Sequence, residues 1–317
     1  MSQGPSIKNV GVIGTGVIGS SWIALFLARG LSVTVTDPAP GAREKLAAYL
    51  EKEWPSLIQI GLSQGASLAN YKFVDSIDNY LEEFDFVQEN APERLDIKRE
   101  LFAHLDAHTR KDAIIASSSS GIPSSQFVTE CKHNPARILI GHPFNPPHLV
   151  PLVEVVPHPG TAELYTKQAV EFYRWLGKSP ILVKQETPGF IANRLQAAVM
   201  SEAYSLVNRG IVSAEDLDMA MSSGPGLRWA LIGPFMNNAL GGGGDFKHFL
   251  DHIGPAASGW LEDMNEHRFE FTTENMGQLA ENVEAWTKTV DMKSVEKERD
   301  QYLVDLVKSK AESRHLK

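Results

Sequence analysis

The fold is decided by residues 11–30, which read GVIGTGVIGSSWIALFLARG. Residues 10–13 predict a buried strand before the glycines, and residues 21–28 predict an apolar helix after them. A second strand is expected at residues 31–36 and ends at Asp37, 18 residues after Gly19. This order of strand, glycine-rich turn, helix and strand is typical of a dinucleotide-binding unit.

The turn has the pattern Gly-x-Gly-x-x-Gly, and each glycine has its own task. Gly14 allows the tight turn, Gly16 lets backbone N–H groups approach a pyrophosphate, and Gly19 lets the helix pack closely on the strand. Asp37 can accept hydrogen bonds from the adenosine ribose and repels a 2′-phosphate, and the following Pro38 supplies no cation. The alternative is a glycine-rich turn in an unrelated α/β fold. We expect NAD rather than NADP, in contact with Gly14, Gly16, Val17, Ile18, Gly19 and Asp37.

The rest of the first half alternates short apolar runs with helical patterns. Further strands are predicted at residues 84–88, 113–116, 137–141, 152–156 and 181–184, and helices at residues 41–52 and 95–108. This alternation predicts a Rossmann-like, mostly parallel sheet covered on both faces. After Pro188 the patterns are helical only, at residues 190–208 and 278–310. We therefore expect an α/β fold with a Rossmann-like domain at residues 1–187 and a smaller all-α domain at residues 188–317.

Composition excludes several classes of function. The 317 residues carry 30 Lys and Arg against 39 Asp and Glu, a net charge of −9, which argues against a nucleic-acid or anionic-membrane surface. Cys131 is the only cysteine, so no intramolecular disulfide forms. There is no long apolar run and no secretory signal pattern, and a cytoplasmic location is expected. The histidine pairs spaced by four residues lack the His-Glu-x-x-His pattern and a third ligand, so no metal is expected.

A histidine and a glutamate flank a proline-rich segment in the second half of the sheet domain. His142 and Glu154 lie 12 residues apart with four prolines between them, so they cannot share a helix. A neutral imidazole suits the removal of a proton from an alcohol at neutral pH, and a carboxylate behind it would fix its tautomer. Two strands joined by a rigid turn could bring the pair together. From spacing alone, structural roles for both residues remain the more frequent outcome.

Several segments of the chain together resemble one family. They are GVIGTGVIGSSWIALFLARG, the strand ending at Asp37, ENAPERLDIKRE, ASSSSGIPSS, GHPFNPPHLVPLVEVVPHP, TPGFIANRLQ and GIVSAEDLD, between residue 10 and about residue 240. The chain resembles the 3-hydroxyacyl-CoA dehydrogenase superfamily, most closely its lambda-crystallin branch, the L-gulonate 3-dehydrogenases. The resemblance implies an NAD-dependent dehydrogenase that acts on the 3-hydroxyl group of a small hydroxy acid, or that reduces the corresponding ketone.

The resemblance also implies roles for individual residues. His142 would be the general base and Glu154 its orienting partner, while Asn193 would hold the substrate or the imidazole at the domain junction. A serine that hydrogen-bonds the reacting oxygen falls in the run of residues 117–120. Counting from His142 favours Ser120 and leaves Ser119 possible.

Three further residues would bind the nicotinamide half of the cofactor by the same resemblance: Glu93, Lys98 and Asn145. Without it, Asn193 could be an ordinary polar helix position, Lys98 a solvated charge and the serine run a flexible turn. The resemblance further implies that the helical domain binds substrate and forms a homodimer.

The substrate is open at this level. Arg228 could hold a carboxylate through two parallel hydrogen bonds, which fits a small hydroxy acid, but it could equally form a structural ion pair or stack on Trp229. The run around these residues is also similar to carnitine dehydrogenases, whose quaternary ammonium suits an aromatic partner. A 3-hydroxyacyl-CoA dehydrogenase and a tailoring ketoreductase are the other enzymatic alternatives. A non-catalytic, crystallin-like NAD-binding protein is the alternative of another class.

Overall fold

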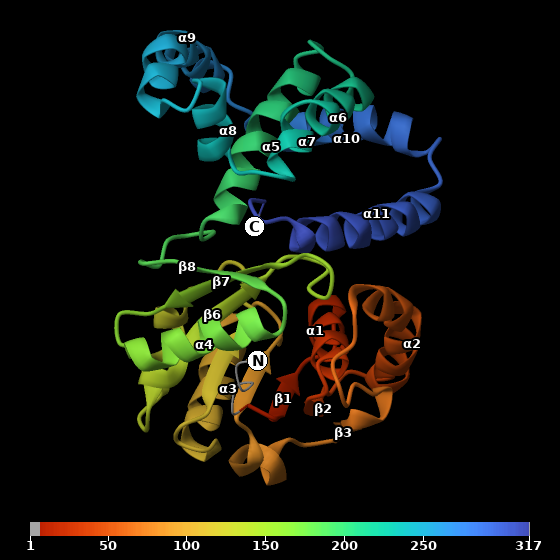
Figure 1. Cartoon of the computed structure of the whole chain (residues 1–317), viewed down its shortest axis with the longest axis vertical. Coiled ribbons are helices and arrows are strands. Elements are labelled where there is room, and N and C mark those ends of the chain that lie inside the picture. The colour runs from red at the N-terminus through yellow and green to blue at the C-terminus, as the bar shows by residue number, and fades with distance from the viewer. Residues whose placement is uncertain (1–6, 317) are drawn as a thin grey trace. The chain divides into compact units, whose positions relative to one another are not determined.

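The computed structural model describes residues 7–316, and the chain divides into two compact units between Arg194 and Leu195. The strands of the first unit are β1 (Asn9–Ile13), β2 (Ser32–Thr36), β3 (Tyr71–Phe73), β4 (Phe86–Glu89), β5 (Ile114–Ser117), β6 (Ile138–Pro143), β7 (Leu152–Pro157) and β8 (Ser179–Leu182). Its α-helices are α1 (Val17–Ala28), α2 (Ala42–Ile60), α3 (Leu95–His108) and α4 (Glu163–Trp175). Figure 1 shows the ribbon of this unit, with labels on most of these elements.

The strands form one sheet in the order β3-β2-β1-β4-β5-β6-β7-β8. All neighbouring pairs are parallel except β6 and β7. The strand order reverses direction between β1 and β4, which is where open α/β sheets bind ligands. The predicted α/β fold with a mostly parallel, Rossmann-like sheet is confirmed. Among the eight strands of this sheet, β3 alone was not predicted from the sequence, because a three-residue strand shows no periodicity.

Two clusters of buried side chains cover the two faces of the sheet. Alternate residues of the central strands, such as Val10 and Val12 of β1, pack with α1, α2 and α4. The intervening residues, such as Ile13 of β1 and Val87 of β4, pack with α3. Every residue of α1 from position 19 onward is buried, which explains why this helix is apolar all round rather than amphipathic. The turn that leads into α1 is therefore held by the core beneath it.

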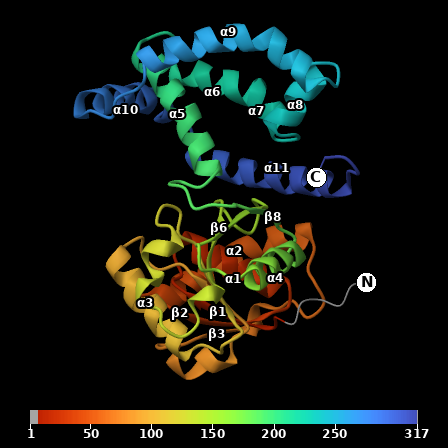
Figure 2. The ribbon, with the colours of Figure 1, turned by 90° about the vertical axis from the view of Figure 1, so that its left-hand side faces the viewer.

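The second unit contains helices and, among its described residues, no strand, as predicted. These helices are α5 (Ala192–Asn208), which begins at the end of the first unit, α6 (Ala214–Ser223), α7 (Pro225–Trp229), α8 (Pro234–Gly241), α9 (Phe246–Glu266), α10 (Thr273–Thr287) and α11 (Met292–Glu312) (Figure 2). The predicted helical stretch 278–310 is interrupted, because Asp291 caps α11 by accepting hydrogen bonds from Lys293 and Ser294. No helix in residues 7–316 is both long and apolar enough to cross a membrane.

Candidate active site

Gly14 and Gly19 are required by the packing of the turn itself. Gly14 follows β1 with φ +86°, and a Cβ there would lie 2.5 Å from the carbonyl oxygen of Asn90. A Cβ on Gly19 would approach the carbonyl oxygen of Gly14 to 2.0 Å. The first position needs a left-handed backbone and the second needs close contact between α1 and the turn, and glycine satisfies both needs.

Gly16 is free of such constraints and opens onto space. A Cβ on it would meet nothing within 4 Å beyond its chain neighbours. Helix α1 begins directly after it with no side-chain cap and no acidic residue in its first turn. The hydrogen bond from the Ser20 N–H to the Gly16 carbonyl, 2.9 Å long, is the first of the helix. The N–H groups of Val17 and Ile18 come before it and have no partner within the helix. An uncapped helix N-terminus beside open space fits a pyrophosphate.

Asp37 lies at the end of β2, beside the turn. Its Oδ2 accepts hydrogen bonds from the Thr15 N–H at 2.6 Å and the Thr15 hydroxyl at 2.7 Å, and its Oδ1 accepts one from the Ala39 N–H at 2.8 Å. Burial by itself would raise the pKa of Asp37, but these hydrogen bonds outweigh it and hold the pKa below its ordinary value. The carboxylate is therefore ionised, which suits ribose hydroxyls and disfavours a 2′-phosphate.

One cleft of about 890 Å³ in the first unit joins these groups. It is lined by Ile13, Gly14, Gly16, Asp37, Pro38, Ala39, Asn90, Ala91, Pro92, Ile97, Glu100, Leu101 and His104. The wall from α3 was not predicted, because its positions follow the pattern of any amphipathic helix. The open cradle at Gly16, the uncapped helix and the ionised Asp37 together fit NAD.

The predicted histidine–glutamate pair is formed. His142 on β6 and Glu154 on β7 stand directly opposite each other in the antiparallel register. The His142 Nδ1 lies 2.7 Å from Glu154 Oε2, and the side chains are 7% and 0% exposed. An ionised carboxylate only accepts hydrogen bonds, so Nδ1 carries the proton and Nε2 carries the lone pair in the neutral ring. No described residue makes a hydrogen bond with Nε2.

The second oxygen of Glu154 is also occupied. Oε1 accepts hydrogen bonds from the backbone N–H groups of Ile191 at 2.9 Å and Ala192 at 3.0 Å, at the start of α5. Burial alone would raise the pKa of Glu154, but His142 and these two N–H groups lower it below its ordinary value. Glu154 therefore stays ionised behind the imidazole, where it can stabilise a positive charge.

Aromatic rings pack around the imidazole. The Phe144 and Phe190 ring centroids lie 5.3 Å and 5.6 Å from that of His142. Phe190 is fully buried and is the only described non-glycine residue with a positive φ, at 49°. These rings limit the directions in which the imidazole can turn.

The structure separates the two candidate serines. Ser119 is buried, and its Oγ lies 2.5 Å from Glu93 Oε1 and 2.8 Å from the Ile122 carbonyl oxygen. Ser120 is exposed, and its backbone carbonyl accepts a hydrogen bond from Asn193 Nδ2 at 3.2 Å. The Ser119 hydroxyl is engaged within the protein, whereas the Ser120 hydroxyl makes no hydrogen bond to a described residue.

Glu93 holds the loop that follows Ser119. Its Oε1 accepts hydrogen bonds from the N–H groups of Gly121 at 2.9 Å and Ile122 at 3.1 Å, besides the Ser119 hydroxyl. Burial by itself would raise the pKa of Glu93, but Ser119, Gly121, Lys98 and Ile122 together lower it. Glu93 thus remains ionised and fixes the loop of residues 119–122.

Lys98 is buried rather than presented to a ligand. Its Nζ lies 2.9 Å and 3.0 Å from the two oxygens of Glu89, 3.5 Å from Ser117 Oγ and 3.5 Å from Glu93 Oε2. The Lys98 side chain is 1% exposed and that of Glu89 is 0% exposed. Glu89 was not found from the sequence, because a single glutamate beside an apolar run has no pattern of its own.

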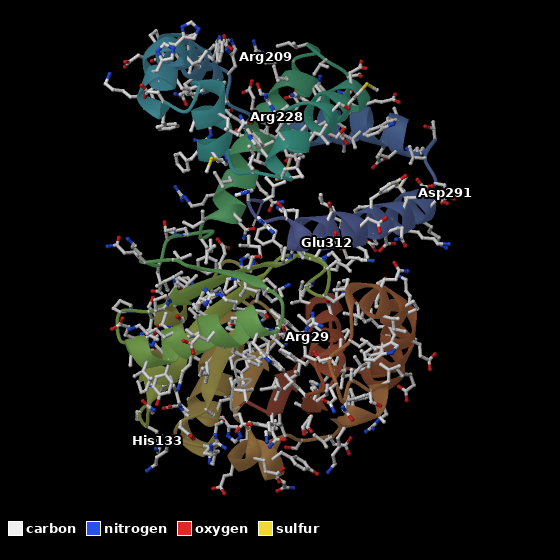
Figure 3. All side chains as sticks on the ribbon, in the orientation of Figure 1. Arg29, His133, Arg209, Arg228, Asp291 and Glu312 are labelled. Carbon is white, nitrogen blue, oxygen red and sulfur yellow. The ribbon has the colours of Figure 1, made fainter. Side chains whose placement is uncertain are left out.

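The remaining predicted residues lie in different settings. Asn145 is exposed in the connection between β6 and β7. Arg228 belongs to the second unit, where it is exposed on α7 without an ion pair to a described residue (Figure 3). The turn, the histidine–glutamate pair, the serine loop and Asn193 all belong to the first unit.

Comparison with protein families matches both parts of the chain. Residues 9–187 match the model for the 3-hydroxyacyl-CoA dehydrogenase NAD binding domain, and residues 189–270 match the model for the C-terminal domain of the same enzymes. The chain is 51% identical over 307 residues to a protein of Gibberella moniliformis named 3-hydroxyacyl-CoA dehydrogenase, covering 96% of this chain and 95% of that protein. It is 46% identical over 257 residues to the L-carnitine dehydrogenase of Streptomyces coelicolor, covering 81% and 80%.

Solved structures agree with this likeness. An NAD⁺-dependent dismutase, FHMPC 5-dehydrogenase, aligns with a TM-score of 0.76 at 29% identity and covers 95% of this chain and 97% of its own. The (S)-3-hydroxybutyryl-CoA dehydrogenase of Ralstonia eutropha aligns with a TM-score of 0.62 at 29% identity, covering 68% and 77%.

Proposed function

The chain belongs to the 3-hydroxyacyl-CoA dehydrogenase family of NAD-dependent dehydrogenases, and from this premise we propose that it oxidises the 3-hydroxyl group of a small 3-hydroxy acid, with His142 as general base. The observation that carries the proposal is the 2.7 Å contact between His142 Nδ1 and Glu154 Oε2. It leaves Nε2 as the basic nitrogen, free of other described partners. The same groups serve the reverse reduction, with the imidazolium returning the proton.

The mechanism follows from the arrangement of the chain's own residues. His142 Nε2 removes the hydroxyl proton of the substrate, and the resulting imidazolium lies against the ionised Glu154. Bound NAD supplies the acceptor for the hydride that leaves C3 of the substrate, and Gly16, Val17, Ile18 and Asp37 would hold it. Because Glu154 is already fixed by two backbone N–H groups, it does not need to reorient as the charge forms.

Ser120 would hold the reacting oxygen, with Asn193 as its support. The free hydroxyl of Ser120 can donate a hydrogen bond to it, and Asn193 supports the loop through the Ser120 carbonyl. We assign the contact to Ser120 rather than Ser119, because the Ser119 hydroxyl already serves Glu93 and Ile122. By family resemblance, Asn145 would meet the nicotinamide half of the cofactor. Glu93 and Lys98 would act there through the loop and the buried ion pair.

L-Carnitine is the substrate to test first. Several relatives carry the name L-carnitine dehydrogenase, at 38–47% identity. Carnitine bears both a carboxylate, which suits Arg228, and a quaternary ammonium, which suits the neighbouring aromatic ring of Trp229. L-Gulonate offers only the carboxylate, and the relatives found do not confirm the lambda-crystallin branch. A 3-hydroxyacyl-CoA thioester offers neither group.

The decisive experiment compares His142→Gln with His133→Gln, an exposed histidine of the same unit that makes no side-chain hydrogen bond to a described residue (Figure 3). NADH formation is followed with L-carnitine, L-gulonate and (S)-3-hydroxybutyryl-CoA. We expect His142→Gln to lower kcat at least about 10²-fold, and His133→Gln to leave it unchanged. Near-wild-type turnover in His142→Gln would exclude the assigned base. NADH binding without turnover of any 3-hydroxy acid would favour the non-catalytic alternative.

Assembly and location stay predictions. The family resemblance implies a homodimer, and a light-scattering mass equal to one chain of 34.9 kDa would contradict it. Cell fractionation tests the cytoplasmic location that the composition predicts.

A further inference from the structure

A second buried histidine lies close to the candidate base in sequence and takes no part in the proposed chemistry. His148 is 5% exposed and lies in residues 144–151, the connection between β6 and β7. This connection joins the strand of His142 to the strand of Glu154, so its position affects both. A buried imidazole in a short connection needs polar partners, and it finds them on two helices of the cofactor-binding unit.

Helix α1 supplies the first partner. Ser21 Oγ accepts a hydrogen bond from the backbone N–H of His148 at 2.8 Å and lies 2.8 Å from its Nδ1. With Oγ accepting from the N–H, its hydroxyl proton is free to go to Nδ1, and the ring proton then sits on Nε2. Ser21 lies five positions after Gly16, on the helix whose first turn forms the pyrophosphate cradle.

Helix α2 supplies the second partner. His148 Nε2 lies 3.3 Å from Glu53 Oε2, an electrostatic contact that does not reach hydrogen-bond geometry. Glu53 is itself 7% exposed. Its pKa lies below the ordinary value, mainly because of His148 and to a smaller extent because of Lys52. An ionised carboxylate therefore faces the protonated nitrogen of the ring inside the unit.

Lys178 also holds this connection. Its Nζ donates hydrogen bonds to the carbonyl oxygens of Pro147 and Val150, the latter at 2.5 Å, and lies 5.4 Å from the centre of the Trp22 ring of α1. The connection is thus tied to α1 through both His148 and Lys178.

We propose that Ser21, His148 and Glu53 form a latch that fixes the connection between β6 and β7 against the cofactor-binding helices, with His148 as a positioning residue for His142. The latch places the proton acceptor and the pyrophosphate cradle on one rigid block. Its catalytic part rests on the proposed function, whereas its structural part does not. A displacement of about 1 Å at a reacting group can cost up to about 10²-fold in rate, so loss of the latch acts on turnover without removing any group that touches the substrate.

The test uses two substitutions that keep different halves of the imidazole. The amide of His148→Asn can reach the position of Nδ1 and retain Ser21, while the amide of His148→Gln can reach the position of Nε2 and retain Glu53. Glu53→Gln removes the carboxylate charge that faces His148 and leaves residues 144–151 unchanged in sequence. His158→Asn is the matched control, because His158 is also buried in this unit but contacts Pro135 and Gly160 instead.

We expect His148→Asn and Glu53→Gln each to lower kcat/KM by about tenfold or more and to leave the Kd of NADH within about threefold. The variant that combines His148→Asn with Glu53→Gln should lose little more kcat/KM than either single variant, because both substitutions break the same contact between His148 and Glu53. His148→Gln, which keeps this contact, should lose less kcat/KM than His148→Asn. Additive losses in the combined variant, or an equal loss in His158→Asn, would overturn the latch.

Hydrogen exchange of residues 144–151 in the cofactor-free protein provides a readout independent of turnover. Exchange there should rise in His148→Asn and in Glu53→Gln and stay unchanged in His158→Asn. If the wild-type protein oxidises no 3-hydroxy acid but exchange rises as expected, the proposed function fails and the latch stands. Unchanged exchange in Glu53→Gln and in His148→Asn would refute it whatever the activity.

Discussion

Lys98 and Glu89 form an ion pair that is almost completely removed from solvent, with Nζ 2.9 Å and 3.0 Å from the two carboxylate oxygens. Glu89 also accepts hydrogen bonds from the Ala91 N–H at 2.7 Å and the Ser117 hydroxyl at 2.5 Å. A buried pair with its remaining lone pairs satisfied is costly to break from one side. The pair therefore supports both the end of β4 and the loop held by Glu93.

Lys98→Met should be strongly destabilising, because it leaves Glu89 charged and buried without its cation. We expect a loss of about 3–5 kcal/mol in the free energy of unfolding, measured by urea denaturation. Lys98→Met combined with Glu89→Gln should recover much of this loss, since no isolated charge remains. A double variant as unstable as Lys98→Met alone would show that the uncompensated charge is not the cause.

The sequence predicted the parts of the site that depend on neighbours in the chain. Gly14, Gly16 and Gly19 follow a strand at fixed spacing, so the glycine motif can be recognised from neighbouring residues alone. Asp37 ends the next strand, and its place follows from the βαβ connection. His142 and Glu154 face each other because β6 and β7 pair in an antiparallel register. The distance between the two residues in the sequence allows this register but does not impose it.

What the sequence left open depends on contacts between distant segments. Ser119 and Ser120 are chemically identical neighbours, and their surroundings differ only in the folded chain, where Ser119 is buried against Glu93 and Ser120 is exposed. Glu89 and Lys98 look like ordinary charges until β4 and α3 bring them together in the core. The latch at His148 was missed for the same reason, because Ser21 and Glu53 precede it by 127 and 95 positions.

Gly16 and Gly19 should respond oppositely to the same substitution. Gly16→Ala places a methyl group in open space, so the Tm should stay near that of the wild type while NADH binding weakens by about tenfold. Gly19→Ala drives a methyl group into the Gly14 carbonyl, so it should lower the Tm or prevent folding. Thermal unfolding and NADH fluorescence titration measure the two effects. A large Tm loss in Gly16→Ala, with NADH binding unchanged in the folded fraction, would contradict the cradle.

Asp37→Asn should shift the choice of cofactor. The amide oxygen can still accept from the two Thr15 groups, whereas the hydrogen bond from the Ala39 N–H is lost, and the charge that opposes a 2′-phosphate is removed. We expect the ratio of NADPH to NADH affinity to rise about tenfold, mostly through tighter NADPH binding. Asp96→Asn, an exposed aspartate at the start of α3, is the control. An unchanged ratio would mean that Asp37 does not set the preference for NAD.

Lys178 should give the protein a pH dependence of stability on the alkaline side. Burial, followed by the charge of Arg29, lowers the pKa of Lys178 from its ordinary 10.5 to about 7. Between these two values the folded side chain is neutral while the unfolded chain still binds a proton, so raising the pH favours the folded state. The gain has an upper limit of about 1.4 kcal/mol per pH unit.

Lys178→Met has no group to titrate there, and its unfolding free energy should therefore lack the rise that the wild type shows when the pH is raised from neutral to about pH 9. Lys184→Met, which removes an exposed lysine, should keep that rise. Parallel pH profiles for the wild type and Lys178→Met would show that Lys178 remains charged beside the Pro147 and Val150 carbonyls.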